Sequence, residues 1–147
     1  YALNPVLRDK ILELLETAVS QMTDGDYEAC ITTFESIDTV GFSDDDLAKY
    51  NSLKAELYPK AADAYYTKGK SDFLSKNMTE AKTDLEAALK YASNENFVDD
   101  IYYYLGQIAE GENDTASAKK YYNKIISEYP DSNQIGNARN ALEGLKE

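Results

Sequence analysis

The chain has 147 residues, of which 43% are hydrophobic and 29% are charged, and its 15 basic and 27 acidic residues give a net charge of −12. This length suits one domain with a buried core, and the composition excludes a disordered chain. No apolar run approaches the roughly 18 residues of a membrane span. The absence of a Lys/Arg cluster argues against nucleic acid or anionic lipid as a partner.

The first predicted element is a pair of helices over residues 5–38. Asn4-Pro5 is typical of a helix cap followed by a first helical residue. Apolar residues then recur at helical spacing as far as a turn at Thr23-Asp24-Gly25-Asp26. A second apolar stripe, which contains Cys30 and Phe34, predicts the second helix of the pair. On that stripe Cys30 is expected to be a small buried hydrophobe and not a reactive thiol.

An extra helix is predicted over residues 44–58. Ser43 is a suitable cap, and three aspartates, Asp44 to Asp46, make an acidic first turn that the helix dipole favours. The alternative is a metal site, but consecutive carboxylates on a helix point in different directions, so we predict no bound metal. Pro59 either kinks this helix or begins a new one.

Two further helical pairs and a final helix are predicted in the rest of the chain. Residues 60–91 form the first pair, and residues 97–131 form the second. Asn and Asp residues supply the turn within each pair, where they are favoured for conformational reasons. Ile135 begins a last apolar stripe, which predicts a helix within residues 132–146.

Glycine and alanine recur 37 residues apart in the two pairs. Gly69 and Ala81 in one pair correspond to Gly106 and Ala118 in the next. A glycine inside a helix costs about 1 kcal/mol relative to alanine, so two in equivalent places indicate a packing reason. We expect the second helix of each pair to cross the first at the glycine, with the alanine as its small residue. Neighbouring large residues, such as Leu85, would fill the flanking space.

These windows resemble the tetratricopeptide repeat family, whose unit is about 34 residues long. The first reads Tyr65-x-x-Lys68-Gly69-x-x-Asp72 and then Ala81-x-x-x-Leu85. The second reads Tyr102-x-x-Leu105-Gly106-x-x-Ala109, then Ala118-x-x-x-Tyr122 and Pro130. The resemblance implies an all-α fold, a right-handed α-α superhelix of stacked hairpins with a C-terminal capping helix at 132–146. Residues 1–147 would then form one domain, with 5–38 as a degenerate pair.

The resemblance also implies a non-catalytic scaffold that binds a protein or peptide on the concave face of the first helices. Tyr66, Lys70 and Phe73 are spaced i, i+4 and i+7, so they share one helix face. Tyr103 and Gln107 repeat the first two positions 37 residues later. We therefore predict that these five residues line one groove. The alternative is that the two tyrosines only fill gaps between adjacent repeats.

The chain contains no histidine, no glycine-rich phosphate loop and no CxxC motif, so neither an enzyme activity nor a cofactor is predicted. Self-association as a homodimer is the alternative function, and a carboxylate-based glycan hydrolase is a more remote one. The segment from Ile125 to Ser132 is similar to repeats of exported bacterial proteins, and the whole arrangement resembles extracytoplasmic parts of membrane-anchored Firmicutes proteins. That similarity predicts an extracytoplasmic location, with an anchor in a preceding segment. A cytoplasmic location is the alternative.

Overall fold

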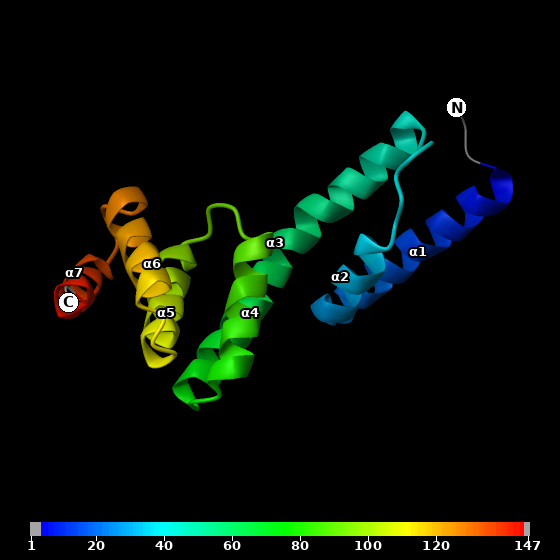
Figure 1. The fold of residues 1–147 in the computed structure, drawn as a ribbon. Helices are drawn as coiled ribbons and strands as arrows, with labels where there is room; N and C mark the ends of the chain where they lie inside the picture. The colour runs from blue at the N-terminus through cyan, green and yellow to red at the C-terminus, as the bar shows by residue number, and fades with distance from the viewer. Residues whose placement is uncertain (1–3, 146–147) are drawn as a thin grey trace. The chain divides into compact units, whose positions relative to one another are not determined.

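The structure is a computed structural model that describes residues 4–145. Its helices follow in chain order (Figure 1): α1 (Pro5–Thr23), α2 (Tyr27–Glu35), α3 (Asp44–Leu74), α4 (Met78–Tyr91), α5 (Val98–Gly111), α6 (Thr115–Glu128) and α7 (Ile135–Gly144). No strand occurs in the described part of the chain, which confirms the predicted all-α class. The chain divides into two compact units, an N-terminal unit up to Ala61 and a C-terminal unit from Ala62. The predictions of one domain and of a continuous superhelix stay predictions.

In the N-terminal unit, α1 and α2 form a helical hairpin. The Asn4 side chain accepts a hydrogen bond of 2.9 Å from the N–H of Val6, and Pro5 is the first helical residue. The interior of the hairpin includes Ala18 and Cys30, both with no exposed surface. The Cys30 thiol donates a hydrogen bond of 3.0 Å to the carbonyl of Ala18, and burial raises its pKa. Cys30 is therefore a buried packing residue, as predicted.

The helix α3 passes through Pro59 without ending. The sequence left open whether one helix or two cover this stretch, and the structure shows one helix of 31 residues. Its start is fixed by the Ser43 hydroxyl, which accepts a hydrogen bond of 3.1 Å from the N–H of Asp46. Asp46 is buried and forms a two-pronged ion pair with Arg8 of α1, with both N–O distances 3.1 Å. The ion pair lowers the pKa of Asp46 and joins α1 to the start of α3.

Three hairpin turns share one backbone geometry. Each has a residue in the left-handed region, namely Gly25, Lys76 or Asn113, with φ of +79°, +66° and +61°. The next residue caps the following helix with φ between −92° and −86° and ψ between 72° and 75°. The backbone N–H of this cap residue donates a hydrogen bond to the carbonyl five residues earlier, with an N–O distance of 2.8 to 2.9 Å in all three turns. The α1–α2 hairpin is thus built on the same local plan as α3–α4 and α5–α6.

The shared turn sets a common register for the three hairpins. Counted from the turn, Ala18 of α1 takes the place of the glycines Gly69 and Gly106. Cys30 takes the place of Ala81 and Ala118, and all three of these side chains have no exposed surface. The first hairpin therefore keeps the small residues that a close helix crossing requires, although it lacks the glycine.

In the C-terminal unit, the two glycines lie at helix crossings, as predicted. A Cβ added to Gly69 would stand 2.8 Å from Cγ of Leu85, and one added to Gly106 would stand 2.5 Å from Cε1 of Tyr122. Both partners have no exposed surface. The side chains that cover the two glycines are therefore Leu85 and Tyr122, large residues that we expected beside the crossings and not at them. The alanines Ala81 and Ala118 lie one helical turn earlier.

The helix α7 covers the α5–α6 hairpin. Its buried Ala138 joins a cluster with Ala118 and Tyr122, and several half-buried apolar residues of α7 pack against that cluster. The segment before α7 is fixed by polar contacts to the first turn of α5. Ser132 donates a hydrogen bond of 2.5 Å to Asp99, and Gln134 donates one of 2.8 Å to Asp100. This packing is the capping role predicted for the last helix.

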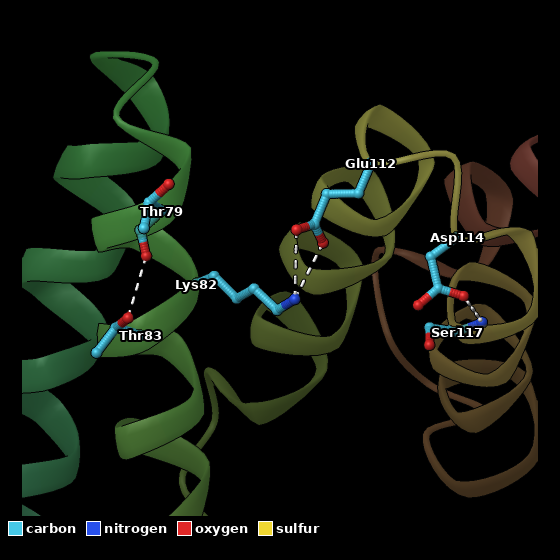
Figure 2. Close-up of polar contacts among 6 residues, drawn as sticks. All are labelled: Thr79, Lys82, Thr83, Glu112, Asp114 and Ser117. Atoms are coloured by element: carbon cyan, nitrogen blue, oxygen red, sulfur yellow. Dashed lines mark hydrogen bonds and ion pairs between the residues drawn. The ribbon is translucent and has the colours of Figure 1, made fainter.

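An ion pair, shown in Figure 2, joins the α3–α4 hairpin to the α5–α6 hairpin. Nζ of Lys82 on α4 lies 3.0 Å from Oε1 of Glu112, the residue that follows α5. In the same view Asp114 caps α6 by accepting a hydrogen bond of 3.1 Å from the N–H of Ser117. Lys82 and Glu112 are both exposed enough for solvent to screen them, so this pair contributes orientation more than stability.

Candidate functional site

The five predicted site residues come from two helices of the C-terminal unit. Tyr66, Lys70 and Phe73 lie on α3, and Tyr103 and Gln107 lie on α5. Tyr66 and Tyr103 each precede the crossing glycine by three residues, and Lys70 and Gln107 directly follow it. Lys70 is exposed, and the other four are partly buried. The surface formed by these five residues is therefore partly exposed and partly covered by the rest of the chain.

Tyr66 is stacked on an aromatic ring from the loop before α5. Its ring lies 4.5 Å from that of Phe97, with 4° between the ring planes. Phe97 itself is buried. Burial raises the pKa of Tyr66 to about 12, and the carboxylate of Asp100 adds to this through its charge and a hydrogen bond. One side of the Tyr66 ring is thus occupied within the chain, and its hydroxyl is held near the start of α5.

A second aromatic contact joins α3 to α5. The rings of Phe73 and Tyr104 lie 4.7 Å apart, and Tyr104 contacts Tyr103 at 6.2 Å. Such ring pairs contribute about 0.5–1.5 kcal/mol beyond the area that they bury. Phe73 and Tyr104 therefore help to hold α3 and α5 together, whereas the ring of Tyr103 contacts Tyr104 of its own helix and Tyr122 of α6. Sequence reasoning missed Phe97 and Tyr104, although the run Tyr102-Tyr103-Tyr104 was a signal for the latter.

Gln107 belongs to a polar network inside the α5–α6 hairpin. Its amide donates a hydrogen bond of 2.7 Å to the hydroxyl of Tyr122 and one of 3.2 Å to Glu110. The Tyr122 hydroxyl in turn donates to the carboxylate of Glu110. Burial, followed by this hydrogen bond, raises the pKa of Tyr122. The network fixes the ring that covers Gly106, so Gln107 is less available to a ligand than its position suggests.

The accessible part of the face is a hollow of about 430 Å³ on α3. It is lined by one aromatic residue, one cation, one aliphatic residue and three hydroxyl groups, which are Tyr66, Lys70, Leu74, Thr67, Ser71 and Ser75. Leu74 is 67% exposed. Lys70 has no ion-pair partner among residues 4–145. Tyr66 and Lys70 therefore meet in one hollow, whereas Phe73, Tyr103 and Gln107 do not line it.

Two carboxyl groups meet at the α3–α4 crossing. Asp84 is 7% exposed, and its carboxyl oxygen lies 3.6 Å from Nζ of Lys68. Burial raises the pKa of Asp84 against the opposing charge of Lys68, and the neighbouring carboxyl of Asp72 raises it further. Neither carboxyl lines the hollow on α3. The pair is placed to influence the stability of the crossing and has no access to a ligand in that hollow.

Comparison with known proteins gives two matches, both in the C-terminal unit. Residues 62–95 match a family model described as "Tetratricopeptide repeat", and residues 100–132 match a second model of the same description. The first match covers the end of α3 and all of α4, and the second covers most of α5 and all of α6. The chain has no significant match among curated proteins or solved structures. The α1–α2 hairpin, which has the same turn geometry, lies outside both matches.

Proposed function

Because the chain belongs to the tetratricopeptide repeat family, we propose that it is a non-catalytic scaffold that binds a protein or peptide on the first-helix face of its repeats. Repeats of this kind generally mediate interactions between proteins, and their stacked helices create extended binding surfaces. The observation that carries the proposal is the hollow on α3, where Tyr66 and Lys70 meet. The complete absence of histidine from the sequence supports a role without catalysis.

The chemistry of the hollow indicates which ligand group it receives. Leu74 and the part of Tyr66 that lines the hollow offer apolar area, and tyrosine presents it with little loss of side-chain entropy. Lys70 offers a positive charge that no described acidic residue pairs with, and the hydroxyls around it can donate or accept hydrogen bonds. We propose that one apolar side chain of the ligand contacts Leu74 and Tyr66, while a carboxylate or a backbone carbonyl of the ligand accepts from Lys70.

A charge-reversal experiment tests this function. The tagged domain and its Lys70→Glu variant are used to capture partners from a native membrane extract, with Lys120→Glu as the matched control. Lys120 is an exposed lysine of α6 outside the hollow, so both variants change the net charge equally. The expected result is loss of one specific partner with Lys70→Glu and retention with Lys120→Glu. Equal capture by both variants would contradict the proposal.

Self-association is the other function open to the same face. Light scattering on the 16.5 kDa chain separates the two functions, because a scaffold for another protein need not dimerise. A dimer that Lys70→Glu dissociates would favour self-association. A monomer that captures its partner through Lys70 would favour the scaffold.

We also propose that the domain lies outside the cytoplasm and is attached to the membrane through a segment other than residues 1–147. The support is the similarity of the segment from Ile125 to Ser132 to exported bacterial repeats. None of the described helices has the length and apolar character needed to cross a membrane. Protease treatment of intact cells tests the location. Digestion of the domain while a cytoplasmic marker survives is expected, and survival of both would contradict it.

A further inference from the structure

The helix α1 is the first helix of its hairpin, as α3 and α5 are of theirs. Its side chains are aliphatic at the positions where those of α3 and α5 are polar or aromatic. In the register set by the shared turns, Leu15 takes the place of Tyr66, and Val19 takes the place of Lys70. Met22 takes the place of Phe73 by the same count. The N-terminal unit therefore presents different chemistry at the positions that line the hollow of the C-terminal unit.

These residues line a groove of about 680 Å³ between α1 and the first half of α3, within the N-terminal unit. Its apolar floor is formed by Leu12, Leu15, Val19, Met22 and Leu53. From Leu12 to Met22 the floor is about 15 Å long, or nearly three helical turns. Val19 is 47% exposed, whereas Leu15, Met22 and Leu53 are buried, so the open part of this floor centres on Val19. Such a floor suits a helix that places apolar residues at i, i+3 or i+4, and i+7.

The charges around the groove favour a basic occupant. Glu16 on α1 and Glu56 on α3 line opposite walls. Glu56 is neutralised in part by Lys60 at 3.4 Å, whereas Glu16 has no ion-pair partner in the described chain. Lys49 also lines the groove, but it lies one turn from Asp46 and helps to lower the pKa of that carboxyl.

The net charge of the whole N-terminal unit is also negative. The N-terminal unit up to Ala61 holds twelve acidic and five basic residues, a net charge of −7. A second copy of this chain, at −12, would be repelled from it. A partner with lysine or arginine beside its apolar stripe would be attracted.

We propose that this groove is a second docking site, which takes an amphipathic helix of a partner protein with an apolar stripe flanked by Lys or Arg. The apolar stripe contacts the aliphatic floor, where the unbranched Met22 adapts to the shape of its side chains. A basic residue of the ligand pairs with Glu16. The site rests on the N-terminal unit alone and does not depend on the proposed function of the hollow around Lys70.

Peptide probes of known design test the site. The first is a fluorescein-labelled amphipathic helix of about 14 residues made of leucine and lysine, which spans about 21 Å. The second replaces each lysine with glutamate, and the third scrambles the leucine–lysine order. Fluorescence anisotropy is expected to show binding of the first peptide, with the other two at least tenfold weaker. No binding of the first peptide, or equal binding of all basic peptides, overturns the proposal.

Variants of the full chain test whether the peptide binds in this groove. Val19→Lys is expected to weaken the leucine–lysine peptide at least tenfold. Val40→Lys is the control, because Val40 is 60% exposed, lies outside the groove and receives the same added charge. Glu16→Gln is expected to weaken binding severalfold and to reduce its dependence on salt. Equal affinity of the two lysine variants overturns the proposal, as does a chain dimer that Val19→Lys dissociates.

Discussion

Replacing Gly106 with alanine tests the helix crossing on which the repeat assignment depends. The new Cβ would lie 2.5 Å from Cε1 and 2.7 Å from Cζ of Tyr122, well inside normal contact. The ring has no exposed surface, and its hydroxyl is held by Gln107 and Glu110, so it cannot withdraw without breaking that network. Overpacking of this kind costs about 1–3 kcal/mol. The intrinsic helix preference of alanine returns up to about 1 kcal/mol. We expect a net loss of about 1–2 kcal/mol in the free energy of unfolding.

Urea denaturation of three alanine variants provides the measurement and its controls. Gly136 is the second residue of α7 and has nothing within 4 Å of an added Cβ, so Gly136→Ala should stabilise the protein by at most about 0.5–1 kcal/mol, the gain for a glycine in mid-helix. A Cβ at Gly69 would stand 2.8 Å from Cγ of Leu85, less close than the 2.5 Å from Cε1 of Tyr122 at Gly106, so we expect Gly69→Ala to cost less than Gly106→Ala. If Gly106→Ala and Gly136→Ala shift the transition in the same direction, the close crossing at Gly106 is refuted.

The remaining predictions concern ionisation and metal binding. Burial raises the pKa of Asp84 in the folded state, so the stability of the wild type should rise as pH falls from neutral through that pKa. Asp84→Asn should be more stable than the wild type at pH 7 and should lack this gain at lower pH. Identical urea midpoints at pH 7 and pH 5 for both proteins would contradict this prediction. The pKa of Tyr66 is raised to about 12 from an ordinary value of about 10, so its contribution to stability should be lost as pH rises across that interval. Tyr66→Phe should remove this part of the alkaline loss in denaturation curves between pH 9 and pH 12, and an unchanged curve would argue against the burial of the hydroxyl. Calorimetry with Ca²⁺, Mg²⁺ and Zn²⁺ should show no saturable site, since the described residues contain no cluster of three metal-binding side chains; a stoichiometric micromolar site would disprove this.

The close crossings could be predicted from the sequence because a glycine inside a helix carries a cost that only packing offsets. Gly69 and Gly106 both proved to be covered by a side chain of the next helix. Which side chain covers them could not be predicted. Ala81 and Leu85 lie one turn apart on the same face of α4, and the choice between them depends on how far α4 slides along α3.

The continuity of α3 could not be predicted because Pro59 has two opposite local meanings. Proline is favoured in the first turn of a helix and disfavoured in its interior, so the sequence allowed either one helix or two. The structure has one helix, with Leu57 and Ala61, on either side of the proline, having no exposed surface. Tertiary packing of these neighbours offsets the backbone hydrogen bond that proline cannot donate.

The binding role of the five site residues stays a prediction, but their surroundings show what helix spacing can and cannot indicate. Tyr66 and Lys70 are four residues apart on α3, and both line the hollow there. The ring of Phe97 that stacks on Tyr66 comes from a loop, and a loop has no periodicity from which such a contact could be inferred. The hydrogen bonds of Gln107 with Tyr122 and Glu110 depend on the α5–α6 crossing, which spacing along one helix does not describe.

Amide hydrogen exchange on the chain alone and in complex with its captured partner tests the central claim most directly. The proposed function predicts slower exchange in the complex along α3 from Tyr66 to Ser75, where the hollow lies, and no change along the outer helices α4 and α6. The Lys70→Glu variant should show neither the complex nor the protection. Protection confined to α4 or α6 would contradict the claim that the first-helix face of these repeats is the binding surface.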